Sequence, residues 1–455
     1  MSEQNLEVCI LAAGMGTRMK STIPKALQLL AGKPLLSHLL ASVQALSPTR
    51  IHVVVGPEGD AVKTAFPDDD INWVTQVERR GTGHALMQAL PDMSDNSRAL
   101  ILLGDAPLVS IQSMMSLVEG DSPLSVLTVH VDDPTGYGRI VRGGPDHILE
   151  IVEERDITRG QEEIDEINTG VMLAEVSGLQ EWLPQLKSDN AQNELLLTDI
   201  VSVANRASLN VRPVVTDDEV EVTGVNSFGQ LTALERALQR RYAQHFLSEG
   251  VHIVDPERFD VRGDLTCGKD VFIDVNNVFE GDVTLGDGVR IGANCHLIDT
   301  VIEPGCVIKD HSHLEGCRVG AQSQVGPFAR LRPGTVLKES VAIGNFVEVK
   351  NSEIGKGTKA SHLTYLGDAS IGDSVNIGAG TITCNYDGID KHRTQIDDHV
   401  FVGSNTAFVA PIVIGAGSTI GAGSTITKDV EEGVLALSRG KQKSVVNWKP
   451  PEVKN

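Results

Sequence analysis

IDDHVFVGSNTAFVAPIVIGAGSTIGAGSTI, residues 396–426, decides how the second half of this chain folds. Apolar residues recur at every sixth position along it, and several of them are followed directly by glycine. A six-residue period with one apolar position is typical of a parallel β-helix, in which that side chain fills the interior on each flat face. The apolar positions are Ile396, Val402, Phe408, Ile414, Ile420 and Ile426.

The same spacing extends back to about residue 270, with slips of one residue that recover. We expect the glycines beside the apolar positions to let the backbone turn the corner between faces. The sequence therefore predicts a left-handed parallel β-helix of hexapeptide repeats over residues 250–455. The further apolar positions are Ile273, Phe279, Leu285, Ile291, Leu297, Val319, Val325, Leu331, Ile371 and Ile377. The glycines are Gly292, Gly320, Gly326, Gly344, Gly372, Gly378, Gly403, Gly415 and Gly421.

The first half of the chain has a different pattern, in which apolar strand-like runs alternate with helical stretches. This alternation favours a mostly parallel sheet with helices on both faces, and we place a Rossmann-like α/β domain at residues 1–228. The expected strands are Val8–Ala12, Ile51–Val55, Ala99–Leu103 and Leu124–Val129, and the expected helices include Pro34–Leu46 and Gly83–Leu90.

Residues 229–249 predict one amphipathic helix that links the two domains, because five apolar residues follow one another at steps of three or four. Gly250 is the expected end of this helix. The five residues are Leu231, Leu234, Leu238, Tyr242 and Phe246.

Composition bounds the cellular setting and the partners. A net charge of −22 argues against nucleic-acid or anionic-membrane partners. The chain has no apolar run of the roughly 18 residues that a membrane span needs. The N-terminal residues lack the basic segment of a signal peptide. The six cysteines form no CxxC pair, which favours free thiols in a reducing cytoplasm.

LAAGMGTRM, residues 11–19, follows the first expected strand. Small residues let backbone N–H groups approach a phosphate, and Arg18 and Lys25 supply positive charge for a triphosphate. The competing interpretation is a dinucleotide fingerprint, but Met19 occupies the place of its third glycine. The string and its following Pro24-Lys25 resemble the sugar-phosphate nucleotidyltransferases.

Asp105 follows the strand Ala99–Leu103. Ligands of open α/β sheets bind at the carboxyl ends of strands, so Asp105 is expected in the same crevice as the glycine-rich loop. A carboxylate there can hold Mg²⁺ on nucleotide phosphates. The alternative is an aspartate that forms a turn before Pro107.

A second candidate site interrupts the six-residue period. Arg332 and Lys350 lie 18 residues apart, one three-sided coil, and so predict a phosphate clamp on neighbouring coils, with a solvated charged face as the alternative. His362 is either structural or a base that deprotonates a sugar amine. The polar loop Thr383–Gln395 is expected to lie over a functional face.

Several further motifs carry a specific resemblance. In order along the chain they are GTGHA at 81–85, DPTGYGR at 133–139, IVEE at 151–154, EINTG at 166–170, GVN at 224–226, SHLTYLGDA at 361–369 and NYDG at 385–388. Together they resemble the bifunctional N-acetylglucosamine-1-phosphate uridylyltransferase / glucosamine-1-phosphate N-acetyltransferase family over nearly the whole chain. One departure is Leu103, where members often have tyrosine.

The resemblance implies roles for individual residues. UTP and UDP-N-acetylglucosamine would be bound by Leu11, Ala12, Ala13, Gly14, Lys25, Gln76, Gly81, Thr82, Leu103, Gly104, Asp105, Gly138, Glu153, Asn168 and Asn226. Mg²⁺ would be bound by Asp105 and Asn226, and Arg18 and Lys25 would assist catalysis. Glucosamine-1-phosphate would be held by Arg332, Lys350, Tyr365 and Asn376, with His362 as the general base. Acetyl-CoA would be bound by Ala379, Asn385, Tyr386, Ser404, Ala422 and Arg439.

The implied sequence of reactions is acetylation of glucosamine-1-phosphate, followed by uridylyl transfer from UTP with release of pyrophosphate. The resemblance also implies a homotrimer acting on small molecules in the cytoplasm. A single-activity pyrophosphorylase with a structural β-helix is the first alternative, and it predicts no His362 motif and no NYDG loop. A non-catalytic regulatory subunit is the second, and it predicts loss of Lys25, Asp105 or Asn226.

Overall fold

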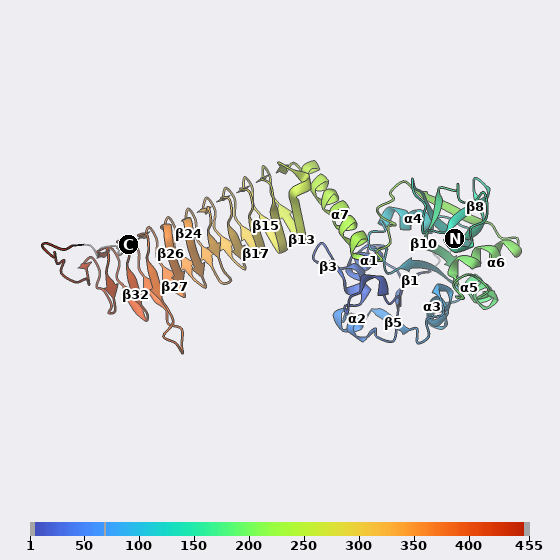
Figure 1. Ribbon diagram of the computed structural model, residues 1–455, viewed down its shortest axis with the longest axis horizontal. Helices are drawn as coiled ribbons and strands as arrows, with labels where there is room; N and C mark the ends of the chain where they lie inside the picture. Colours follow the sequence, from blue (N-terminus) through green and yellow to red (C-terminus); the bar gives the residue numbers. More distant parts are fainter. Residues whose placement is uncertain (1–4, 68–69, 450–455) are drawn as a thin grey trace. The chain divides into compact units, whose positions relative to one another are not determined.

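The computed structural model describes residues 5–67 and 70–449. Internal contacts divide the chain into two compact units, Met1–Leu238 and Gln239–Asn455. Figure 1 labels the main helices and strands of each unit. The fold class expected from the sequence is confirmed in both.

The first unit is built on a nine-stranded mixed sheet with the central order β11-β7-β10-β6-β1-β4-β5. Six of these seven strands are parallel to one another, and β10 is antiparallel to both of its neighbours. The strands are β1 (Asn5–Ala12), β4 (Arg50–Val55), β5 (Ile71–Thr75), β6 (Ser97–Leu103), β7 (Leu124–His130), β8 (Arg139–Gly144), β9 (His147–Val152), β10 (Glu166–Glu175) and β11 (Val211–Thr216). A separate hairpin joins β2 (Leu29–Leu30) to β3 (Lys33–Pro34).

Alternate residues of the central strands point to opposite faces of this sheet, so each face has its own core. In β1, Val8 and Ile10 lie in the core that contains α1 and α4, whereas Cys9 and Leu11 lie in the core that contains α3, α5 and α6. Helices therefore cover both faces, as the alternating pattern predicts. They are α1 (Leu35–Gln44), α2 (Asp60–Ala65), α3 (Thr82–Ala89), α4 (Ile111–Val118), α5 (Val176–Trp182) and α6 (Ile200–Arg206).

The predicted linker helix is α7 (Phe228–Ser248), and Gly250 follows it with a φ of +89°. Its first half holds Glu235, whose carboxylate accepts a 2.7 Å hydrogen bond from the Ala31 amide. Its second half contributes the buried Ala243 to the core of the β-helix, and Phe246 packs edge-on against Phe259.

The second unit is a parallel β-helix of 25 short strands, β12 to β36. Paired residues are mostly 17 or 18 positions apart, as in Ala342 with Lys359 and Arg330 with Glu348, so each coil has three faces of about six residues. The strands are β12 (His252–Ile253), β13 (Phe259–Cys267), β14 (Phe272–Ile273), β15 (Asn277–Leu285), β16 (Arg290–Ile291), β17 (His296–Ile302), β18 (Val307–Ile308), β19 (His313–Glu315), β20 (Arg318–Val319), β21 (Gln324–Val325), β22 (Arg330–Leu331), β23 (Val336–Leu337), β24 (Ala342–Lys350), β25 (Glu353–Ile354), β26 (Lys359–Gly367), β27 (Ala369–Ile371), β28 (Asn376–Ile377), β29 (Ile382–Cys384), β30 (Thr394–Ile396), β31 (Phe401–Val402), β32 (Ala407–Val409), β33 (Ile412–Ile414), β34 (Thr419–Ile420), β35 (Thr425–Ile426) and β36 (Leu435–Ala436).

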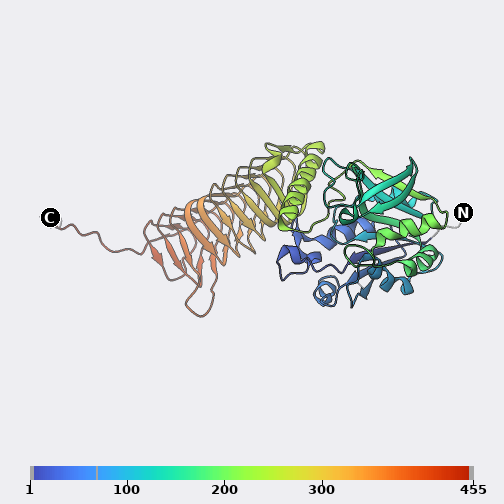
Figure 2. The same cartoon turned by 45° about the vertical axis from the view of Figure 1, so that its right-hand side comes forward.

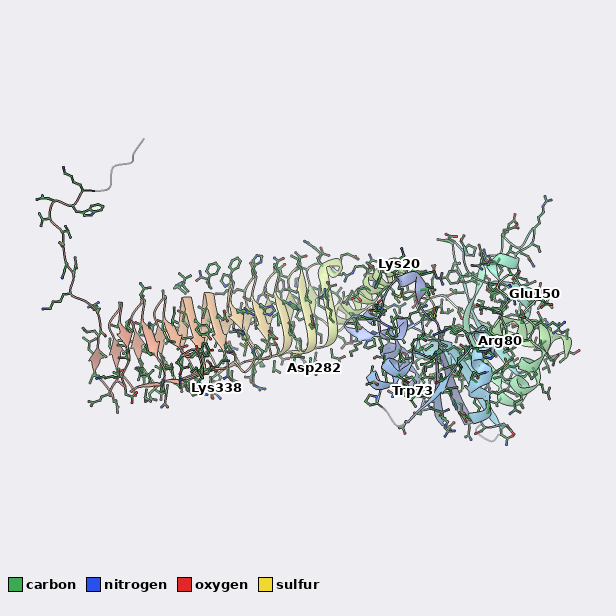
Figure 3. All side chains as sticks on the ribbon, turned by 60° about the horizontal axis from the view of Figure 1, so that its bottom comes forward. Lys20, Trp73, Arg80, Glu150, Asp282 and Lys338 are labelled. Carbon is green, nitrogen blue, oxygen red and sulfur yellow. The ribbon has the colours of Figure 1, made fainter. Side chains whose placement is uncertain are left out.

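The predicted apolar positions all lie in the interior of the β-helix, where they form one continuous core. Polar and charged side chains stand outward along its length, with Asp282 and Lys338 labelled among them in Figure 3. One long excursion interrupts the coils between β29 and β30, where paired residues such as Ala369 and Thr394 lie 25 positions apart. Figure 2 shows this loop projecting from the side of the β-helix.

The glycines beside the apolar positions have a different role from the one expected. Of the nine, only Gly326 has a left-handed φ, at +98°. At most of the others an added Cβ would press on backbone of the next coil, for example 2.6 Å from the Ser404 nitrogen at Gly378 and 2.5 Å from the Ala422 nitrogen at Gly403. The expectation that they turn corners was therefore wrong: glycine is needed because adjacent coils approach too closely for a side chain.

The corners use other residues in left-handed backbone. The corner that precedes β22, β29 and β32, and at which β24 and β26 bend, is called here the first corner. Its left-handed position is filled by Asn294, His311, Phe328, Phe346, Leu363, Gly380, Asn405 and Gly423 on successive coils.

Candidate functional sites

Two adjoining cavities of about 290 Å³ each lie at the carboxyl ends of β1 and β6 in the first unit. Thr82, Leu103 and Asp105 line both, so these residues stand at the junction of the two cavities. The first is lined by eleven of the residues predicted to bind nucleotide: Leu11, Ala12, Ala13, Gly14, Lys25, Gln76, Gly81, Thr82, Leu103, Gly104 and Asp105. The second is lined by the other four, Gly138, Glu153, Asn168 and the predicted metal ligand Asn226.

Glycines bring the backbone of the first cavity close to any ligand. Gly14 has open space where a Cβ would stand, so its backbone faces the cavity directly. Gly104 donates a 2.9 Å hydrogen bond to the Leu11 carbonyl, and a Cβ there would lie 2.8 Å from the Cβ of Ala12. The ends of β1 and β6 therefore pack together only because residue 104 has no side chain.

Three loops converge on one cation position. The Lys25 ammonium donates to Oδ2 of Asp105 at 2.5 Å and to Oδ1 of Asn226 at 2.8 Å. A backbone hydrogen bond of 2.8 Å from the Val225 amide to the Asp105 carbonyl holds Asn226 beside Asp105. The two residues predicted to bind a metal thus already present two oxygen atoms to one positive charge.

The opposite wall of the first cavity consists of Gln76 and the start of α3. Nε2 of the buried Gln76 donates to the Gly81 carbonyl at 3.1 Å and lies 3.1 Å from Nδ1 of His84. The Thr82 hydroxyl accepts a 3.0 Å hydrogen bond from the Leu197 amide. The His84 ring thus supports the Gln76 side chain.

Two neighbouring carboxyl groups have raised pKa values, Glu153 in the lining of the second cavity and Asp199, which directly follows the lining residue Thr198. Burial raises the pKa of Glu153, whose Oε1 accepts a 2.9 Å hydrogen bond from the Thr198 hydroxyl. Burial, with the nearby Glu153 carboxylate as the next cause, raises the pKa of Asp199 to about 6. Leu103, which departs from the family pattern, packs beside Gly170, where an added Cβ would overlap its side chain.

The arginine that lines the first cavity is Arg79, not the predicted Arg18. Arg18 is exposed in the short 3₁₀ turn Thr17–Met19 and lines neither cavity. Arg79, which no motif singled out, lines the first cavity, donates to the Ala13 carbonyl at 2.7 Å and pairs with Glu58.

In the second unit, the predicted catalytic base and three of the predicted acetyl-CoA residues form a row along the first corner. The strand pairing places His362, Ala379, Ser404 and Ala422 on successive coils. At the end of the row, the Arg439 guanidinium donates a 3.0 Å hydrogen bond to the Ala422 carbonyl. Coils in such a structure are about 4.8 Å apart, so the row forms a long surface along which an extended ligand can lie.

His362 is exposed at the start of this row, and its Nδ1 lies 2.6 Å from Oδ1 of Asn345 on the preceding coil. An amide oxygen accepts a hydrogen bond, so Nδ1 carries the proton and Nε2 is left as the basic atom. Asn345 was not among the predicted site residues. It lies inside β24, in the sequence GNF at 344–346, which matches none of the motifs above.

The charged residues of the phosphate clamp lie on the second face, which follows the first corner. Arg332 and Lys350 stand on neighbouring coils, as their spacing predicts, and Arg332 pairs with Glu348 at 2.9 Å. Lys391, a residue that the sequence did not single out, approaches Lys350 from the excursion, and this second ammonium is the main cause that lowers the pKa of Lys350.

The other two predicted sugar-phosphate residues lie on either side of the first corner. Tyr365 belongs to the second face, where it pairs with Ile382, whereas Asn376 lies in β28 on the preceding face. The chain by itself therefore does not bring Asn376 onto the face that carries Arg332 and Lys350.

Asp368 anchors the excursion to the coils. Its buried carboxylate accepts hydrogen bonds from Asn351, at 2.6 Å, and from Asn385. Further out, Asp387 pairs with His392 at 2.7 Å, and the Tyr386 hydroxyl donates to the Gly388 carbonyl at 2.7 Å. The predicted acetyl-CoA residues Asn385 and Tyr386 are thus presented by an internally braced loop.

Comparison with family models agrees with the two folds. Residues 8–166 match the MobA-like NTP transferase domain, residues 261–362 the GMPPB C-terminal domain, and residues 393–428 the bacterial transferase hexapeptide of six repeats. The molecule therefore combines a nucleotidyltransferase domain with a left-handed hexapeptide β-helix, the architecture of a sugar-nucleotide transferase.

Full-length relatives identify the family. The bifunctional protein GlmU of Ralstonia nicotianae is 51% identical over 448 residues, covering 98% of both chains. That of Marinobacter nauticus is 49% identical over 449 residues, covering 98% of this chain and 99% of the relative. This chain belongs to the GlmU family: it is a transferase with N-acetylglucosamine-1-phosphate uridylyltransferase and glucosamine-1-phosphate N-acetyltransferase activities in the synthesis of UDP-N-acetylglucosamine. Membership sets aside both the single-activity pyrophosphorylase and the regulatory subunit.

A solved putative glucose-1-phosphate thymidylyltransferase from Bacillus anthracis aligns with 51% of this chain and 94% of its own, at a TM-score of 0.42 and 20% identity. This likeness is too weak to add to the assignment. In the part of the chain that the structure describes, no helix combines the length and apolarity of a membrane span.

Proposed function

We propose that uridylyl transfer takes place in the two adjoining cavities of the first unit. The glycine-rich loop, Lys25, Gln76, Gly81 and Thr82 would bind UTP in the first cavity, and Gly138, Glu153 and Asn168 would bind N-acetylglucosamine-1-phosphate in the second. The observation that carries this proposal is the convergence of Lys25, Asp105 and Asn226 at the junction of the two cavities.

The reaction needs alignment and charge neutralisation more than a base. The sugar phosphate is already an anionic nucleophile, and the two cavities would hold it in line with the α-phosphorus of UTP. Lys25 and the backbone N–H groups of the loop would stabilise the charge that develops on the phosphates. Arg79 lines the same cavity, whereas Arg18 would have to reach the triphosphate from its exposed position.

The family carries out metal-dependent nucleotidyl transfer, and we propose Mg²⁺ as the metal. One carboxylate and one amide oxygen that already bind an ammonium fit the oxygen donors that Mg²⁺ prefers. When bound by Asp105 and Asn226, the ion would supply Lewis-acid neutralisation of the phosphates.

We propose that acetyl transfer takes place at the first corner of the β-helix. Nε2 of His362 would remove a proton from the amine of glucosamine-1-phosphate as it attacks the thioester, with Asn345 fixing the tautomer. Arg332, Lys350 and Lys391 would hold the phosphate, and Tyr365 and Asn376 the sugar. Acetyl-CoA would follow the row Ala379, Ser404 and Ala422 to Arg439, beside Asn385 and Tyr386.

A convex corner cannot enclose a ligand by itself, and we propose that the enzyme is a homotrimer whose copies complete this site. Phe328, Phe346 and Leu363 are 47%, 56% and 62% exposed in left-handed backbone, where the other coils have asparagine, glycine or, at His311, histidine. The His311, Phe328 and Phe346 rings stack at 4.8 and 5.2 Å. Exposed apolar side chains in strained backbone support a covered surface.

We also propose domain limits of 1–228 and 250–455, with 229–249 as the helical link, and action in the cytoplasm. All six cysteines are free thiols, which suits a reducing compartment. UTP, acetyl-CoA and the sugar phosphates would be the small-molecule partners, without nucleic acid or membrane.

Two variants of the full chain, each assayed for both reactions, test the assignment. Asp105→Asn should lower uridylyl transfer by at least about 10²-fold, because an amide replaces the carboxylate at the metal. His362→Ala should lower the kcat of acetyl transfer by about 10²- to 10⁴-fold. Each variant should leave the other reaction unchanged. Equal loss of both activities in either variant, or a normal rate of the targeted reaction, would contradict the assignment.

A further inference from the structure

Lys25 occupies an unusual position for a residue that is expected to bind phosphate. Its ammonium is committed to Asp105 and Asn226 rather than to the open cavity. The pair is partly shielded, since the side chains of Lys25 and Asp105 are 11% and 24% exposed. The two oxygen atoms that would bind a divalent cation are therefore already occupied by a positive charge of the protein itself.

We propose that the Lys25 ammonium takes the place of the divalent cation in the nucleotide-free enzyme, and that the metal must displace it in order to bind. This inference rests on the proposed function, because it takes Asp105 and Asn226 as the metal ligands. An ammonium and a divalent cation cannot share these oxygen atoms, because two positive charges a few ångströms apart repel strongly in a shielded site.

The surroundings give the displaced side chain somewhere to go. Lys25 lines the first cavity and also a separate cavity of about 300 Å³, which is lined by the glycine-rich loop and by residues from 55 to 62. A lysine has a flexible four-carbon stem, so its ammonium can move several ångströms while its backbone stays in place. Nucleotide phosphates in the first cavity would attract it away from Asp105.

Metal and nucleotide binding are then coupled through one side chain. Without nucleotide, the metal competes with an ion pair and binds weakly. With nucleotide, the ammonium is drawn to the phosphates and the oxygen atoms of Asp105 and Asn226 become available. The coupling is reciprocal, because each ligand favours the arrangement that the other requires.

Binding of Mn²⁺ to the nucleotide-free full chain, followed by the electron paramagnetic resonance signal of the free ion, tests this exchange without any turnover. Lys25→Met removes the competing ammonium at similar length, and Lys25→Gln is a polar second variant. Both should bind Mn²⁺ at least about tenfold more tightly than the wild type, since an ion pair no longer has to be broken. Arg79→Met removes a different cation of the same cavity and should produce a much smaller gain.

The double variant Lys25→Met/Asp105→Asn distinguishes the possible failures. This variant should lose the increase in Mn²⁺ affinity and bind the ion only as weakly as the other carboxylates of this acidic chain do. If the Lys25 variants show unchanged or weaker Mn²⁺ affinity while Asp105→Asn still abolishes uridylyl transfer, the exchange is wrong and the site assignment stands. If the double variant binds as tightly as Lys25→Met, the metal is not on Asp105, and the proposed metal site itself fails.

Discussion

The two proposed active regions of this chain are opposite kinds of surface. The first is concave: residues from six or more separate loops line two adjoining cavities within one unit. The second is convex: residues at equivalent positions of successive coils form a row along one corner of a β-helix. Specific small-molecule sites are normally concave, so under the proposed assignment the first would be self-contained and the second would need a further surface.

The difference follows from how each fold repeats. An open α/β sheet brings the carboxyl ends of several strands to one edge, and different loops can be placed around one ligand. A solenoid places equivalent residues one above another, which produces a track but no walls. In the proposed homotrimer, the excursion after Cys384 would form one wall, and a second copy that covers the exposed aromatic residues of the first corner would form another.

Among the residues that no sequence motif identified, Asn345 is the one whose substitution should lower activity most. Asn345→Ala should lower the kcat of acetyl transfer by about 10- to 100-fold, as loss of a supporting hydrogen bond usually does. Asn345→Asp should restore most of the rate and move the acid limb of the pH–kcat profile upward, because a carboxylate raises the pKa of the adjacent imidazole. A purely structural Asn345 would lower the rate without moving that limb.

A smaller effect is expected at Lys391. Lys391→Ala should raise the KM for glucosamine-1-phosphate about tenfold at neutral pH, as expected for loss of one charge-assisted hydrogen bond. In the wild type, Lys391 lowers the pKa of Lys350, so phosphate affinity is lost as the pH rises through that lowered value. The variant should shift this alkaline loss to higher pH.

Lys338→Ala is the matched control for Lys391, because Lys338 is an exposed lysine of the same β-helix that pairs with Glu353 at 2.8 Å on another face. Its KM and pH profile should equal those of the wild type. An unchanged KM in Lys391→Ala, or an equal shift in both variants, would remove Lys391 from the site.

The smallest effect concerns stability in the first unit. The pKa of Asp199 is raised to about 6 from 3.8, so the folded chain binds its proton more tightly than the unfolded chain does. Stability therefore falls as the pH rises from about 4 to 6, and the cost remains at neutral pH. Asp199→Asn should raise the free energy of unfolding of this unit by about 1–2 kcal/mol at about pH 8.

Urea denaturation of wild type and Asp199→Asn at about pH 8 and about pH 5.5 measures this. The difference should shrink at the lower pH, where Asp199 in the wild type is largely protonated. A variant that is less stable at the higher pH would show that the Asp199 carboxylate makes a favourable contact, contrary to the account.

Sequence could predict the folds because both depend on short-range periodicity. Every predicted six-residue apolar position is in the β-helix core, and Val8–Ala12 and Ala99–Leu103 lie within neighbouring strands. The explanation for the glycines failed because the closeness of adjacent coils depends on residues 17 or 18 positions away. No local pattern reports that distance.

The site residues show the same contrast between short-range motifs and contacts that depend on distant residues. Nucleotide and sugar residues within motifs line the cavities, whereas Arg79, Asn345 and Lys391 carry no motif and were found only once the chain was folded. The Lys25 ion pair joins residues 80 and 201 positions apart. Sequence supplied these residues as separate candidates and could not show that they bind one another without a ligand.

The most direct test of the contrast between the two regions is a chain that cannot self-associate. Phe328→Glu/Phe346→Glu places charge on the apolar stripe of the first corner, and Val413→Glu, at an exposed apolar position on another face, is its control. Mass measurement in solution gives the oligomeric state, and both reactions are assayed on each chain. The account predicts a monomeric double variant with normal uridylyl transfer and acetyl transfer reduced at least about tenfold, and an unaffected control. A monomer with full acetyl transfer would contradict it, as would a double variant that still forms trimers.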